Sequence, residues 1–166
     1  MNAAVWFGGS FCFMVAVAPS FFSAEMKKHF GEIWTGVIAF IVFGRYFALQ
    51  YWCGAIALAH HLAEWVYLGR PLQRLTIAIV LGVFALGLAG GLFVQPRLER
   101  LHAIKYGKPE LFTGAQKAQA ARSLSIWHGI SRVSGLISLI GLGVYMWRMG
   151  NPPNSPRFVA SNTFRS

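Results

Sequence analysis

Five polar side chains lie inside or at the rims of long apolar runs and are the residues best placed to bind a ligand. His128 lies four residues before Arg132, with Ser131 between them, so the three share one side of a helix. Arg45 and Arg97 stand at the rims of two other apolar runs. A charge at the centre of a bilayer costs about 2.5 to 3.5 kcal/mol, so such residues usually mark functional sites. We therefore predict a basic pocket for an anionic or quinone-like ligand, formed by Arg45, Arg97, His128, Ser131 and Arg132.

Hydrolytic chemistry finds little support in the composition. The chain has five Glu and no Asp, so paired-acid hydrolysis is excluded. Ser125 and Ser131 lie near His128, but no acid lies on that run to orient the imidazole, and no Gly-x-Ser-x-Gly sequence occurs. We predict no catalytic residue and expect a protein that is not an enzyme.

Two redox centres are weaker alternatives. A b-type haem needs two axial ligands for one iron, but His60 and His61 are expected about 15 Å in depth from His128. Cys12 and Cys53 are soft ligands that suit copper, but nothing in the sequence fixes their relative geometry. We therefore predict neither a metal nor a cofactor.

The composition indicates a membrane protein. Hydrophobic residues make up 55% of the 166 residues, and charged residues only 12%, against roughly 25% in ordinary globular proteins. The net charge is +10, but the basic residues lie between apolar runs, which favours anionic lipid head groups over nucleic acid. We expect a multi-pass protein of an inner or plasma membrane, with membrane lipids as partners and no nucleic acid.

Four apolar runs are long enough to cross a bilayer, because about 20 residues at 1.5 Å each cover a hydrocarbon core of roughly 30 Å. A cleaved signal peptide competes for the first run, but a basic segment before it is missing. The stretch 33–59 is too long for one upright crossing, so an interfacial helix is predicted at residues 33–44. The predicted spans are residues 3–24, 45–63, 75–94 and 124–147.

The fold class is thus an all-α integral membrane protein, a four-transmembrane-helix bundle with an interfacial helix and one helical cytoplasmic-side loop. The loop is residues 95–122, predicted as two short helices, with Thr113 as N-cap of the second and Gln116 at its capping-box position. Residues 1–149 form the membrane domain, and residues 150–166 form a polar, Pro-rich tail.

Four spans place both termini on one side of the membrane. The opposite side carries more Lys and Arg, so the positive-inside rule puts the loop in the cytoplasm. The second and fourth helices start at the surface where the third ends, so the predicted pocket should lie beneath the loop. In the structural alternative, its arginines bind lipid phosphates and helix-end carbonyls and hold the loop on the bundle.

Short sequence motifs in all four spans give a more specific indication. Together they resemble the transmembrane protein 205-like family, a group of four-span proteins defined by a domain of unknown function. The resemblance implies a four-helix membrane fold and adds weight to Arg45, Arg97 and His128, but it implies no reaction or cofactor. The motifs are Val5-Trp6-Phe7-Gly8-Gly9 with Ala18-Pro19, Phe43-Gly44-Arg45-Tyr46-Phe47, Val94-Gln95-Pro96-Arg97 and Trp127-His128-Gly129-Ile130-Ser131.

The leading functional hypothesis is a non-enzymatic membrane protein whose basic pocket binds lipid head groups or a small amphiphilic or anionic ligand. The alternative is an accessory subunit of a larger respiratory or transport complex, or a homo-oligomer. Small residues at four-residue spacing, such as Gly8, Cys12 and Ala16, give each helix one face for close packing. Large residues such as Phe11 and Trp52 are then left to face lipid or a partner subunit.

Overall fold

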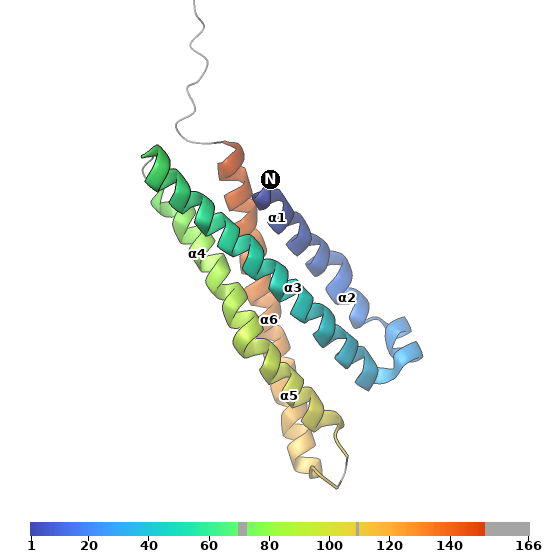
Figure 1. Cartoon of the computed structure of the whole chain (residues 1–166). Coiled ribbons are helices and arrows are strands. Elements are labelled where there is room, and N and C mark those ends of the chain that lie inside the picture. The colour runs from blue at the N-terminus through green and yellow to red at the C-terminus, as the bar shows by residue number, and fades with distance from the viewer. Residues whose placement is uncertain (70–72, 109, 152–166) are drawn as a thin grey trace, which may run out of the picture.

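The computed structural model describes residues 1–69, 73–108 and 110–151, and every element in them is helical (Figure 1). Short π-helical segments, η1 and η2, lie between α-helices without interrupting them. The elements are α1 (Asn2–Cys12), η1 (Phe13–Val17), α2 (Ala18–Phe21), α3 (Ala24–Leu68), α4 (Arg74–Ala89), η2 (Gly90–Val94), α5 (Gln95–Tyr106) and α6 (Gly114–Gly150).

Four helical rods are long and apolar enough to cross a membrane, which confirms the predicted four-span architecture. The N-terminus and the last turn of α6 lie at the same end of the bundle, here called the termini end (Figure 1). The turn between α5 and α6 lies at the opposite end, here called the loop end. The four rods are Asn2–Phe21, Ala24–Leu68, Arg74–Tyr106 and Gly114–Gly150.

The interfacial helix predicted at residues 33–44 is wrong, because these residues are an unbroken part of α3. The departure from helical geometry inside α3 is at Gly31, with φ 71° and ψ 168°, a conformation almost confined to glycine. A short helical segment, residues 24–30, precedes Gly31. Its N-cap is Ser23, whose Oγ accepts a hydrogen bond from the Met26 N–H. The helix continues without a break from Glu32 to Leu68, so Arg45 lies within it rather than at its start.

Two prolines lie inside continuous rods rather than ending them. A proline ring normally collides with the carbonyl group four residues earlier in an α-helix. Pro19 is the second residue after η1 and Pro96 is the second after η2, so in both cases the carbonyl four residues earlier belongs to a wider π-helical turn. The third rod therefore continues through Pro96 to Tyr106, a length of 33 residues or about 50 Å.

The predicted polar loop is a helical hairpin made of α5 and the first turns of α6. The predicted cap is confirmed: the Gln116 N–H donates to Thr113 Oγ1 at 3.3 Å, and the Thr113 N–H donates to Gln116 Oε1 at 2.9 Å. Lys117 Nζ also donates to the Gly107 carbonyl at 2.6 Å. Because the first rod ends at Phe21 after about 30 Å, this hairpin projects beyond it at the loop end (Figure 1).

The core lies toward the termini end, where α1, α3, α4 and α6 meet in a cluster that includes Trp6, Leu142 and Tyr145. A buried polar network ties α1 to α3 beside it. Trp6 Nε1 donates to Gln50 Oε1 at 2.5 Å, Gln50 Nε2 donates to Ser10 Oγ at 2.7 Å, and Ser10 Oγ donates to the Trp6 carbonyl. These bonds satisfy polar groups that lipid cannot solvate.

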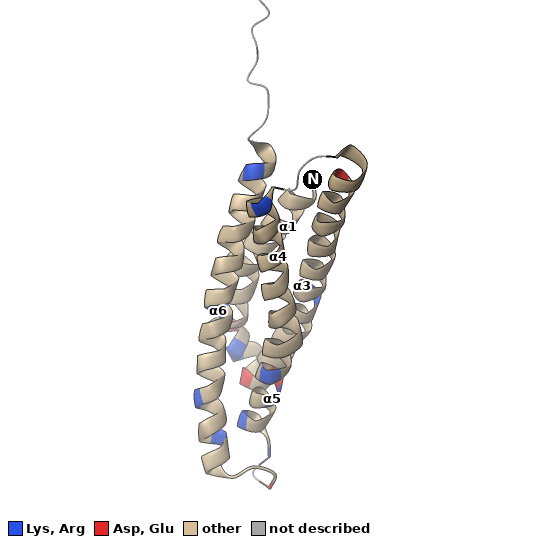
Figure 2. Cartoon of the chain, turned by 90° about the vertical axis from the view of Figure 1, so that its left-hand side faces the viewer, with Lys and Arg blue, Asp and Glu red and all other residues tan. Residues whose placement is uncertain are grey.

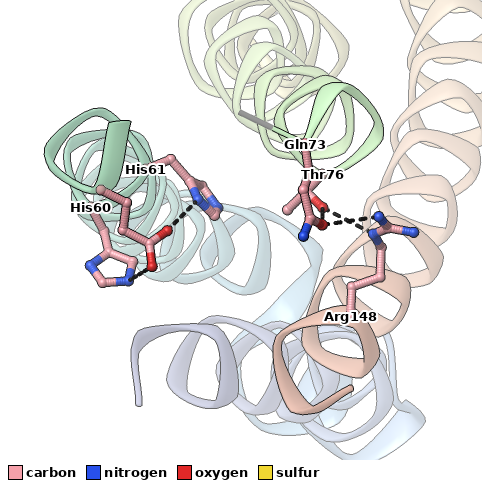
Figure 3. A network of polar contacts seen from close by, with 6 residues as sticks. His60, His61, Gln73, Thr76 and Arg148 are labelled. Carbon is pink, nitrogen blue, oxygen red and sulfur yellow. Dashed lines mark hydrogen bonds and ion pairs between the residues drawn. The ribbon is translucent and has the colours of Figure 1, made fainter. Parts of the chain in front are cut away.

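Polar contacts also hold the termini end together (Figure 3). Arg148 at the end of α6 donates to Thr76 Oγ1 at 2.9 Å and to Gln73 Oε1 at 3.1 Å, at the start of α4. Within α3, Glu64 Oε1 lies 3.8 Å from His60 Nε2, and Glu64 Oε2 lies 3.4 Å from His61 Nδ1. The predicted stop of the second helix is confirmed at Gly69, which has φ 59°; Arg70, Pro71 and residues 152–166 lie outside the described residues.

Candidate functional site

Three of the five predicted site residues lie together. His128, Ser131 and Arg132 line a cavity of about 540 Å³ between the η1–α2 segment and the middle of α6, here called the inner cavity. The Arg132 guanidinium lies 6.0 Å from the centre of the Phe22 ring, and the His128 ring meets the same ring edge-on at 5.6 Å. Phe22 follows the end of the first rod, so these contacts lie about 30 Å from the start of that rod. They therefore lie at the expected depth of the membrane interface on the loop side.

Arg45 and Arg97 have other surroundings. Arg45 lines a separate groove of about 700 Å³ between α3 and α5, together with Glu99 of α5. The Arg97 guanidinium lies over the Trp127 ring at 5.3 Å from its centre, so it joins α5 to α6. The structure therefore groups three of the predicted residues in one cavity and gives Arg45 and Arg97 separate contacts between helices.

The inner cavity has an apolar wall and a polar wall. Met14, Pro19 and Phe43 are among the residues of its apolar wall. Ser131 and Ser138 face it from α6, and Gln50 reaches it from α3. Leu136, which is 53% exposed, is one of the lining residues, so the cavity lies close to the outer surface of the bundle there. A bilayer around the bundle would therefore lie close to this side of the cavity.

A second cavity, of about 290 Å³, lies nearer the loop end and is called the outer cavity. Its polar lining includes Lys27, Glu32, His102, Lys105 and Tyr106 near the loop end, and aromatic and aliphatic side chains supply much of the rest. The Tyr106 hydroxyl donates to Glu32 Oε2 at 2.5 Å, and Lys105 Nζ donates to the Tyr106 oxygen at 2.7 Å. These bonds link α5 to α3 at the polar end of the cavity.

Gly36 allows His102 of α5 to approach α3 closely at this cavity. A Cβ atom at Gly36 would stand only 2.1 Å from His102 Nε2, so any other residue here would displace the imidazole. His102 also meets the Phe40 ring edge-on at 5.4 Å and lies 4.6 Å from the Tyr106 ring. The imidazole is therefore held in place by packing on both sides.

The two cavities are adjacent, because seven residues line both of them. On α3, the combined lining runs from Glu32 to Gln50, and on α6 it runs from Ala121 to Ser138, each about 26 Å by helical rise. The residues common to both cavities, here called the neck, are Phe22, Phe43, Phe47, Gly90, Val94, His128 and Ser131. We call the whole space the joined cavity.

Charge is distributed unevenly along this space. Figure 2 shows that most Lys, Arg and Glu residues of the described chain gather near the two ends of the bundle. The inner cavity has one fully charged lining residue, Arg132, whereas the outer cavity has Lys27, Glu32 and Lys105. An occupant of the joined cavity would therefore meet a mixed apolar and uncharged polar lining, with Arg132, in the inner cavity and more charged groups at the loop end.

Sequence reasoning missed the polar end of the outer cavity. His102 and Tyr106 are four residues apart, a spacing that places both on one side of a helix. Their partner Glu32 is 74 positions from Tyr106, and the two meet only because α5 continues the third rod back past α3. A prediction that the third helix continues to Tyr106 would have placed Tyr106 near Glu32.

The fold and the cavities define a class: a four-helix membrane protein whose bundle holds two adjacent cavities, with most of their charged lining residues near the loop end. The chain belongs to the family Domain of unknown function (DUF4149), whose model matches residues 1–106. The matched part holds α1 to α5 and therefore all of the lining of the joined cavity except the residues of α6. Among curated proteins and among solved structures, nothing matches the chain.

Proposed function

We propose that this protein binds an amphiphile in the joined cavity and has no catalytic activity of its own. The observation that carries the proposal is that the two cavities lie end to end and share the lining residues of the neck, which include His128 and Ser131. Ligand sites usually combine a mainly apolar lining with a few convergent polar groups, in volumes of about 300 to 1,000 Å³. The joined cavity has this character.

The position of Arg132 supports a lipid as the source of the ligand. Its side chain is exposed, it lines the inner cavity, and it lies at the expected depth of the loop-side head groups. A guanidinium at this depth binds phosphate or carboxylate well, since it presents several donors in a fixed plane. An apolar chain could pass this residue from the bilayer into the cavity on the side where Leu136 lies.

Photo-crosslinking tests the proposal directly. The protein, purified in mild detergent, is incubated with a fatty acid that carries a diazirine on its chain, irradiated, and digested for mass spectrometry. We expect adducts on peptides that hold Ser131 and Ser138, and fewer adducts in Ser131→Trp, which fills the neck. Ala78→Trp, at an exposed position of α4, is the matched control and should label as the unmodified chain does.

Two results separate the outcomes. If Ser131→Trp elutes as a single species, unfolds at the temperature of Ala78→Trp and still labels at the cavity, the amphiphile does not occupy the neck and the proposal is wrong. Uniform labelling of exposed residues such as Ile126 and Ile140, with no excess in the cavity, also contradicts it.

The accessory-subunit alternative keeps one specific observation in its favour. Large apolar side chains on the outside of the bundle, including Trp52 at 71% and Phe93 at 72% exposure, suit a partner subunit as well as lipid. Stability of the chain purified alone separates the two roles, and a visible absorption spectrum tests the haem and copper alternatives. Membership of the transmembrane protein 205-like family is part of the proposal, supported by the motif resemblance.

A further inference from the structure

We infer that the ligand is a long single-chain amphiphile with an anionic head, and that its head binds in the outer cavity at Lys27 and Lys105 while its chain passes the neck into the inner cavity. This inference rests on the proposed function and specifies the ligand class and its orientation. It follows from the charges at the polar end, from the length of the joined cavity and from the phenylalanine side chains of its neck.

The charges at the polar end favour an anion. Two ammonium groups, Lys27 and Lys105, and one carboxylate, Glu32, line the outer cavity. Glu32 already accepts a hydrogen bond from Tyr106, and Lys105 uses one of its three N–H groups on the same hydroxyl. Lys105 therefore has two donors left for a carboxylate or phosphate, and the local charge is positive with Lys27 included.

The length of the space fits a chain that is anchored outside the bilayer. The joined cavity is about 26 Å long, whereas one leaflet of a hydrocarbon core is about 15 Å deep. A chain whose methyl end lies among Met14, Leu86 and Gly135 would place its head past the Phe22 level, in the projecting part of the bundle. The outer cavity then shields the upper part of the chain from water.

Three phenylalanine side chains line the neck. Phe22, Phe43 and Phe47 form much of its wall, and a Cβ at Gly90 would stand 2.6 Å from the Phe47 ring. The Phe47 ring therefore packs closely against the backbone of Gly90. A glycerolipid with two chains would need both to pass this point, so a fatty acid or a lysophospholipid fits better than a phospholipid.

Competition with the diazirine fatty acid tests the inference on the full chain in detergent. The competitors are palmitate, a palmitoyl lysophosphatidate, hexadecanol and octanoate. We expect palmitate or the lysophosphatidate to compete best, which identifies the head as carboxylate or phosphate, and we expect hexadecanol and octanoate to compete at least tenfold more weakly. Equal competition by hexadecanol overturns the anionic head, and equal competition by octanoate overturns the anchored long chain.

Single substitutions test the position of the head. Lys105→Gln and Lys27→Gln should each weaken the anionic competitor by about tenfold and leave hexadecanol unchanged, because each removes one charge-assisted contact. Lys28→Gln, exposed and next to Lys27, is the matched control and should change neither. If both lysine variants bind like the control, the head lies elsewhere and the inference is wrong, although cavity labelling would still support the proposed function. If nothing labels the cavity in any protein, the proposed function itself fails.

Discussion

Gln50 is the residue whose replacement most directly tests the account of the buried core. It is 4% exposed within a membrane-spanning rod, and its side chain is hydrogen bonded at both ends. The amide oxygen accepts from Trp6 Nε1, and the amide nitrogen donates to Ser10 Oγ. Gln50→Leu keeps the volume approximately and removes both bonds, so it isolates the polar contribution.

The expected cost follows from what remains unpaired. Ser10 Oγ keeps its bond to the Trp6 carbonyl, but Trp6 Nε1, on a side chain with 0% exposure, loses its acceptor. A buried donor without a partner costs about 1 to 3 kcal/mol. We therefore expect Gln50→Leu to lower the free energy of unfolding by about 1 to 3 kcal/mol.

A double-mutant cycle measures this in detergent by reversible unfolding. Trp6→Phe removes the indole donor, so Gln50→Leu should cost less in that background, with a coupling of about 0.6 to 1.7 kcal/mol, the range seen between membrane helices. Gln119→Leu, at an exposed position of α6, is the control and should stay within about 0.5 kcal/mol of the unmodified chain. A coupling of zero, or equal costs for Gln50→Leu and Gln119→Leu, would refute the reasoning.

Three further changes are read by the same unfolding measurement. Gly36→Ala should lower the free energy of unfolding by about 1 to 3 kcal/mol, because the new methyl group would lie 2.1 Å from His102 Nε2. In the control Gly8→Ala the methyl group meets nothing within 4 Å, so stability should be unchanged or higher. Equal costs for the two variants would contradict the packing described. Arg148→Ala removes two bonds to α4 and should cost about 1 kcal/mol, with faster hydrogen exchange at the start of α4; unchanged exchange would show that the bonds do not hold that end. Gly31→Ala should cost about 1 to 3 kcal/mol because of its positive φ, and a neutral result would mean that the bend relaxes freely.

The spans were predictable because they depend on local composition. An apolar run of about 20 residues has few alternatives to a membrane helix, and the Thr113 cap depends on two side chains three positions apart. The same local reasoning failed at residues 33–44 and at residue 94, the predicted end of the third span. There, the helices continue because they pack on one another along their length and because a π-helical turn accommodates Pro96.

The candidate site was predictable only along single helices. His128, Ser131 and Arg132 share one side of α6, and periodicity was enough to group them. Arg45 and Arg97 were added by an argument about depth alone, which says nothing about the direction around each helix. The pair Glu32 and Tyr106 was missed because their contact depends on how α3 and α5 pack, which no short window of the sequence contains.

The wide turn η2 has a consequence for how the chain tolerates changes in length. A π-helical turn holds one residue more than an α-helical turn would, so everything after Gly90–Val94 is rotated by about 100° relative to an uninterrupted helix. The side of α5 that carries His102 and Tyr106 faces α3 because of that added residue. Loss of a single residue from this turn would leave every side chain of α5 intact and still swing them away from the cavity, so the turn fixes the angular setting of the polar end.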